Sequence, residues 1–133
     1  MTQIVVPVRY PLSEHSRATL AEAIDIADEK DASLTVLHIN LYQNGKRVSR
    51  SQLKQAIESE FGQLANTRYS VRSGLLVEES ILEEIAADDT DIVVIGKKQV
   101  SRWRKMIERI TDDPDVETYL RERVNCEIIT VSP

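Results

Sequence analysis

The chain has 133 residues, the length of one domain, because domains most often run to roughly 100–150 residues. Hydrophobic residues make up 41% of it, which excludes a disordered tail, and one cysteine excludes an internal disulfide framework. The net charge of -5 argues against a general nucleic-acid coat. No apolar stretch approaches the roughly 18 residues of a membrane span, so we expect a single domain, 1–133, of a cytoplasmic protein.

Short runs rich in Val and Ile predict the strands. In chain order the runs are 3–8, 33–39, 68–73, 91–96 and 127–131. All but one are almost continuously apolar, which is typical of strands covered on both faces in a parallel sheet. The exception is the third run, which places Tyr69 and Val71 on one face and polar residues on the other.

Helical periodicity fills the segments between the strands. The segments 13–30, 49–64 and 77–87 repeat apolar residues three and four positions apart. Ser13 or Ser16 is suited to cap the first helix. The Asp-Pro-Asp run at 113–115 is typical of a helix start and predicts a short last helix that ends near residue 124. This alternation predicts a three-layer α/β sandwich with a five-stranded parallel sheet.

Two strand orders are common for such a sheet, 3-2-1-4-5 and 2-1-3-4-5. They differ in whether the third strand lies at an edge or in the middle. The run 68–73 is the most polar of the five, and a polar strand suits an edge. We therefore favour the order 3-2-1-4-5.

Positive charge is concentrated in one segment of the chain. Residues 97–109 hold six basic side chains against Glu108 alone, which gives this segment a charge of +5 and leaves -10 for the rest. At about 100° per residue, the segment 100–110 forms an amphipathic helix with its basic side chains on one face. The apolar residues on the other face are Val100, Trp103, Met106, Ile107 and Ile110.

Three interpretations of this helix stay open. In the simplest, the apolar residues around Trp103 cover the end of the sheet and the basic face is solvated. In the second, the helix is a surface for a partner or an anion, and the partner surface is formed by Arg102, Trp103, Lys105 and Arg109. The third is contact with a membrane surface, for which one helix of three turns is weak support.

Several segments, taken in order, carry a family resemblance. They are IVVPV at 4–8, ADEKDA at 27–32, SLTVLHI at 33–39, Gly74, ILEEIAADDTDIVVIG at 81–96, and YLRERVNCEIITV at 119–131, which contains Cys126. This set resembles the universal stress protein domains and spans almost the whole chain. The resemblance implies a Rossmann-type α/β domain, similar to the adenine nucleotide alpha hydrolases, that is usually a homodimer paired through its last strand, here 127–131.

One branch of that family binds ATP, with an Asp after the first strand and a G-x2-G-x9-G-[S/T] loop after the fourth. Here Arg9 stands in place of the Asp, Gly96 matches the first glycine, and Gln99 stands in place of the second. The third glycine position is Arg109, or 114–115 in another register, and no glycine follows Gly96. Because glycines let backbone N–H groups approach phosphates, these departures predict a divergent member that lacks the ATP loop and binds neither ATP nor magnesium.

Basic residues nevertheless follow the first and fourth strands, at the end of the sheet where open α/β sheets bind ligands. The residues predicted there, as a vestigial nucleotide or anion pocket, are Val8, Arg9, Ile39, Gly96, Lys97 and Lys98. Two readings stay open. The three cations hold a phosphate or another small anion, or Arg9 pairs with an acidic residue of 112–117 and fills the pocket. We favour the filled pocket.

The sequence contains no catalytic triad, paired carboxylates or metal-ligand spacing, so we expect neither an enzyme nor a metal site. His38 is expected at the core or pocket edge, and Cys126 as a buried filler. The leading hypothesis is a non-catalytic universal-stress-type protein that does not bind ATP. It would act in stress response or regulation as a dimer, through an unknown protein partner and not through nucleic acid. The alternatives are a nucleotide- or phosphate-binding stress sensor and a regulatory domain that docks through the helix 100–110.

Overall fold

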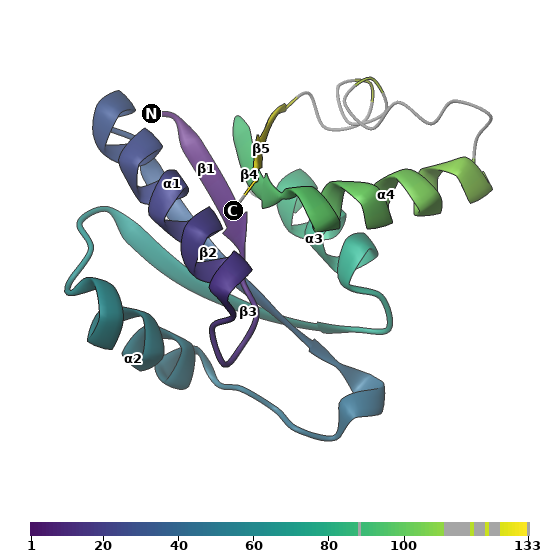
Figure 1. Cartoon of the computed structure of the whole chain (residues 1–133), viewed down its shortest axis with the longest axis horizontal. Coiled ribbons are helices and arrows are strands. Elements are labelled where there is room, and N and C mark those ends of the chain that lie inside the picture. The colour runs from purple at the N-terminus through teal and green to yellow at the C-terminus, as the bar shows by residue number, and fades with distance from the viewer. Residues whose placement is uncertain (88, 111–117, 119–121, 123–125, 133) are drawn as a thin grey trace.

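The computed structural model describes residues 1–87, 89–110, 118, 122 and 126–132. Its helices and strands alternate along the chain, as the sequence predicts (Figure 1). In order they are β1 (Gln3–Pro7), α1 (Glu14–Lys30), β2 (Ser33–Leu41), the short 3-10 helix η1 (Tyr42–Asn44), α2 (Arg50–Phe61), β3 (Thr67–Gly74), α3 (Val77–Ala87), β4 (Ile92–Gly96), α4 (Lys97–Ile110) and β5 (Glu127–Val131).

The five strands form one parallel sheet in the order β3-β2-β1-β4-β5. This confirms the predicted order and places the polar third strand at an edge. The longest pairing joins β2 to β3, from Leu34 opposite Thr67 to Leu41 opposite Gly74. The order reverses at β1, so the carboxyl ends of β1 and β4 flank the switch point at which such sheets bind ligands.

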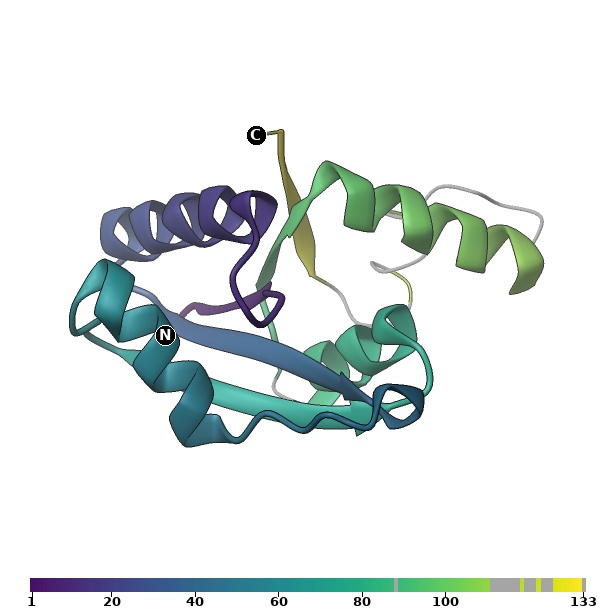
Figure 2. The same cartoon turned by 60° about the horizontal axis from the view of Figure 1, so that its bottom comes forward.

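Helices cover both faces of the sheet. Residues of α1 and α2 form one hydrophobic core with Ile4 and Val6 of β1, whereas residues of α3 and α4 form the other with Val5. Figure 2 shows α1 and α2 on the left of the sheet and α3 and α4 on the right. The inner strands are therefore buried on both faces, which explains their continuous apolar sequences.

The helix ends follow local capping rules. The Ser13 hydroxyl accepts a hydrogen bond from the Ser16 N–H at 3.1 Å, which confirms Ser13 as the cap of α1. Ser49 and Gln52 form a reciprocal capping box at the start of α2. The predicted helix 49–64 ends earlier, at Phe61, because Gly62 adopts a φ of 77° and stops it.

The helix α4 begins at Lys97, three residues before the predicted start at residue 100. It follows β4 directly, with no loop between Gly96 and Lys97. The predicted last helix, 113–124, lies outside the described residues. Within the described ranges, no helix has the length and apolar character needed to cross a membrane.

Candidate functional site

A cavity of about 220 Å³ lies at the carboxyl ends of β1 and β4. Its lining includes all the residues predicted for the pocket except Lys97, namely Val8, Arg9, Ile39, Gly96 and Lys98. It also includes His38, which was expected at the core or pocket edge, and Ser13, which was expected as a helix cap. Among the lining residues that the sequence did not assign to the pocket are His15, Ser16, Thr19, Gln99 and Arg102. The fold thus gathers side chains from β1, α1, β2 and α4 around one cavity.

The turn between β1 and α1 forms one wall of this cavity. The Arg9 N–H donates to the Ser16 hydroxyl oxygen at 2.9 Å, and the Ser16 N–H in turn donates to Ser13. The Thr19 hydroxyl donates to the His15 carbonyl oxygen at 2.8 Å. These hydroxyl groups hold the turn and the first turns of α1 in place. The Arg9 side chain is exposed and gives this wall a positive charge.

His38 lies on the β2 side of the cavity and is half-buried, which agrees with its predicted place at the pocket edge. Its Nδ1 lies 3.2 Å from the carbonyl oxygen of Val8, and its ring packs edge-on to Tyr10 with 6.2 Å between the ring centroids. Burial lowers the pKa of His38, so the ring is neutral at pH 7. Because a carbonyl oxygen only accepts, Nδ1 carries the proton and Nε2 is left as an acceptor.

The first turn of α4 forms the opposite wall. Gly96, Lys98 and Gln99 all line the cavity, so the first N–H groups of the helix lie beside it. Such N–H groups have no partner within the helix, and together with the helix dipole they favour a bound anion. Arg102 lies one turn beyond Lys98 and lines the same cavity, although the sequence assigned it to a partner surface.

The charge of this lining is positive. Arg9, Lys98 and Arg102 are exposed, and none of them forms an ion pair with another residue that the structure describes. No acidic residue lines the cavity in the described part of the chain. The predicted pairing of Arg9 with an acid of 112–117 falls on residues outside that part.

Trp103 and Ile107 on the apolar face of α4 are buried, which corrects the place of Trp103 in the predicted partner surface. Trp103 is 0% exposed, and its indole N–H donates to the carbonyl oxygen of Glu78 in α3 at 3.2 Å. It packs with Ile107 in the core shared by α3 and α4, so Trp103 is not available at a partner surface. Arg102, Lys105 and Arg109 are exposed, as the simplest reading of an amphipathic helix expects.

Comparison with known proteins identifies the architecture. No protein-family model matches the chain, and no curated protein matches it. Among solved structures, the universal stress protein UspA from Lactobacillus plantarum is 18% identical with a TM-score of 0.64, over 98% of this chain and 97% of that one. A universal stress protein in complex with cAMP is 15% identical with a TM-score of 0.61, over 96% and 95%. A member from Burkholderia pseudomallei is 13% identical with a TM-score of 0.61, over 98% and 95%. The chain has the fold of the universal stress proteins.

The match to this universal-stress fold covers 96–98% of the chain and confirms the likeness predicted from the ordered sequence segments. Identities of 13–18% establish the fold and not the ligand, so the chemistry of the site has to be argued from its own residues. In this chain the universal-stress fold carries a helix, α4, directly after β4, where the resemblance led us to look for a glycine-rich loop.

Cys126 is a further residue that the sequence singled out. Cys126 is 3% exposed, and burial raises the pKa of its thiol to about 11, so the thiol stays protonated at neutral pH. It packs in the core with α3 and α4, as expected of a small buried filler. Among the described residues, His, Cys, Asp and Glu form no group of three or more that could hold a metal ion.

Proposed function

We propose that the chain is a non-catalytic domain of the universal-stress type that binds a small phosphate-bearing anion rather than ATP and acts in stress response or regulation. One observation carries the proposal: Arg9, Lys98 and Arg102 converge on a cavity with no acidic lining residue in the described part of the chain. The proposal keeps the leading hypothesis that ATP is not bound. It adopts the ligand of the alternative hypothesis, a phosphate or another small anion. It does not adopt the interpretation that the sequence favoured, in which Arg9 pairs with an acidic residue and fills the pocket.

The size and backbone of the cavity favour a small anion over a nucleoside triphosphate. Its volume of about 220 Å³ is below the roughly 300–1,000 Å³ typical of sites for drug-sized ligands. The backbone at Lys97 is already helical and cannot form the nest of N–H groups that cradles a triphosphate. One of the similar structures is in complex with cAMP, a nucleotide with a single phosphate, and this supports one phosphate group in the cavity, with the rest of a larger ligand outside it.

Each cation has a distinct role in this proposal. The Arg9 guanidinium can bind two phosphate oxygens at once, because its N–H groups form a planar fork. Lys98 adds a point charge at the start of α4, next to N–H groups that also favour an anion. Arg102 closes the cavity from the next turn of the same helix.

Thermal unfolding with inorganic phosphate, cAMP or Mg-ATP tests the proposal. A ligand at 100 times its dissociation constant adds about 2.7 kcal/mol of stability, which gives a clear rise in melting temperature. We expect that rise with phosphate or cAMP, and we expect Arg9→Ala and Lys98→Ala to reduce it. Arg104→Ala removes an equal charge from the exposed face of α4 outside the cavity lining, and it should leave the rise intact.

The same experiment can overturn the proposal. A rise that persists in both Arg9→Ala and Lys98→Ala would place the ligand elsewhere. A larger rise with Mg-ATP than with cAMP at equal concentration would restore ATP as the ligand. Sodium chloride at matched ionic strength is the necessary reference, because salts alter stability without binding a site.

A homodimer through β5 is the second part of the proposed function. β5 lies at one end of the strand order, beside β4, with Ile128 and Ile129 half-buried. An edge strand offers unpaired backbone groups to a second sheet, and apolar side chains on that strand can add buried area. We infer that two copies pair through this edge, as the family resemblance implies.

A further inference from the structure

The opposite edge of the sheet is formed by β3, which pairs with β2 over its whole length. The carbonyl oxygen of Asn66 accepts a hydrogen bond from the Leu34 N–H at 2.9 Å, so the backbone of Asn66 faces β2. The direction of the backbone groups alternates along a strand, and those of Thr67 and of every second residue after it therefore face the open edge. An unpaired row of this kind is a template for a further strand.

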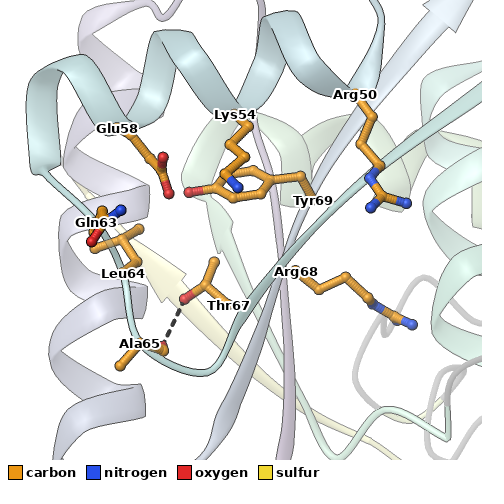
Figure 3. Close-up of a pocket in the computed structure, with 9 residues that line it drawn as sticks. All are labelled: Arg50, Lys54, Glu58, Gln63, Leu64, Ala65, Thr67, Arg68 and Tyr69. Atoms are coloured by element: carbon orange, nitrogen blue, oxygen red, sulfur yellow. Dashed lines mark hydrogen bonds between the residues drawn. The ribbon is translucent and has the colours of Figure 1, made fainter.

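Two adjoining hollows follow this open edge. One, of about 570 Å³, lies between α2 and the start of β3 and is drawn in Figure 3. The other, of about 430 Å³, continues along β3 toward Glu84 of α3. They share Arg50, Arg68 and Tyr69 as lining residues, so they form one surface, which we call the β3 groove.

Basic side chains flank the β3 groove. Arg50 and Lys54 project from α2, and Arg68 and Arg72 come from β3 itself. Arg50 and Lys54 are exposed and form no ion pair with any described residue. Figure 3 shows Arg50, Lys54 and Arg68 around the same hollow.

Acidic residues compensate these charges only in part. Glu84 has 4% of its side chain exposed, and it accepts hydrogen bonds from Ser70 at 2.6 Å and Arg72 at 3.1 Å. Glu58 is the other acid of the groove within the described ranges. Arg72 also pairs with Glu83 of α3 at 3.8 Å. The positive charge of the β3 groove therefore lies on its α2 side, where Arg50 and Lys54 outnumber Glu58, on a chain whose net charge is -5.

Tyr69 lines both hollows of the β3 groove. Its hydroxyl is buried and interacts with the Glu58 carboxylate of α2. Figure 3 shows the hydroxyl pointing toward the Glu58 carboxylate, beside Lys54. Burial and Glu58 raise the pKa of Tyr69 to about 12, so the hydroxyl keeps its proton and remains a donor.

We propose that the β3 groove binds an extended acidic segment of a partner protein, which joins the five-stranded sheet as a further strand beside β3. Backbone hydrogen bonds to the open edge hold the segment, and its acidic side chains meet Arg50 and Lys54 on the α2 face. Charged edges also prevent unselective pairing, and the positive sign of this edge selects acidic strands. The β3 groove shares no lining residue with the anion cavity, so strand binding at the groove and anion binding in the cavity can be tested independently.

Fluorescence anisotropy with a short labelled peptide of alternating Glu and Val tests the proposal. We expect saturable binding that weakens with added salt. Two control peptides separate charge from strand addition. A Lys-Val peptide reverses the charge, and a Glu-Pro peptide keeps the acidic charge but lacks alternate backbone N–H donors. Both should bind about tenfold more weakly or worse.

Variants of the chain locate the binding. Arg50→Glu combined with Lys54→Glu should weaken binding of the Glu-Val peptide by about tenfold or more. Lys30→Glu combined with Arg104→Glu changes the net charge equally at exposed positions outside the groove, and it should bind like the wild type. Val71→Pro removes an outward N–H from β3 and should also weaken binding, with circular dichroism to verify that the variant is folded.

Three results would overturn the proposal. The first is absence of saturable binding of the Glu-Val peptide at low salt. The second is equal binding by the charge-reversed pair Arg50→Glu and Lys54→Glu. The third is equal binding of the Glu-Pro peptide, which would reveal charge attraction without a new strand.

Discussion

Arg9 occupies the position at which the family resemblance led us to expect an aspartate. An aspartate there would add negative charge at the carboxyl end of β1, whereas Arg9 adds positive charge next to Lys98 and Arg102. The three positions therefore carry a charge of +3, where an aspartate at position 9 would leave +1. The difference strengthens the attraction of the cavity for a phosphate, because unit charges a few ångströms apart interact by about 4 kcal/mol near a protein surface.

His38 allows a prediction about pH. Burial holds its pKa in the folded chain below the ordinary value of 6.5. As the pH falls through that value, the unfolded chain takes up a proton that the folded chain does not, so this residue makes the folded state lose stability. We expect urea unfolding of the wild type to show this loss below about pH 6.5 and His38→Gln to show a smaller one. Identical pH profiles for the two proteins would contradict the prediction.

At the scale of elements, α4 is held to the molecule by its buried apolar face. Trp103 and Ile107 are both 0% exposed and pack against α3, and the Trp103 indole N–H is bonded to Glu78. The basic face of the helix is left in solvent, where it contributes little to stability. The position of Lys98 and Arg102 beside the cavity therefore depends on this apolar contact.

Replacing the tryptophan should test that dependence. We expect Trp103→Ala to lower the free energy of unfolding by about 3–5 kcal/mol, because it opens a large cavity in the core and leaves the Glu78 carbonyl without this donor. Chemical denaturation followed by circular dichroism measures the loss. Arg104→Ala, on the exposed face of the same helix, should change the free energy by less than about 0.5 kcal/mol. A similar small change in Trp103→Ala would show that α4 is not anchored there.

At the scale of the whole molecule, the two edges of the sheet differ in chemistry. β3 is flanked by charged residues from α2 and from itself, whereas β5 offers half-buried Ile128 and Ile129. An apolar edge suits a permanent partner such as a second copy, and a charged edge suits a selective and salt-dependent one.

Light scattering at micromolar concentration should test the dimer. We expect twice the mass of one chain for the wild type. The Glu127 N–H faces β4, where it donates to Asp91, so the backbone of Thr130 faces the open edge. Thr130→Pro removes that outward N–H and should give a monomer, whereas Thr130→Val keeps it and should remain a dimer. A monomeric wild type would exclude pairing through β5.

The strand order could be predicted from the sequence because the burial of each strand determines how apolar its sequence is. Strands covered on both faces are continuously apolar, and the polar run 68–73 could lie only at an edge. Element ends were harder to predict. The second helix stops at Phe61 because of the backbone conformation of Gly62, and α4 starts at Lys97 because no loop separates it from β4.

The candidate site was predicted in part for a similar reason. Strand order brings the ends of β1 and β4 together, so Arg9 and Lys98 could be assigned to one cavity from topology alone. Arg102 was not predicted to line the cavity, because its position depends on the rotation of α4 about its own axis relative to the sheet. Trp103 was considered for a surface because a helical plot separates two faces without showing that α3 covers one of them.

The direct passage from β4 into α4 has a kinetic consequence. A flexible loop that folds over a ligand must lose conformational freedom on binding, and it must reopen before the ligand can leave. Here the backbone from Gly96 to Lys97 is already ordered, so an anion would enter and leave without that step. The occupancy of the cavity would then follow the surrounding ligand concentration promptly, which suits a reversible sensor better than a nucleotide store.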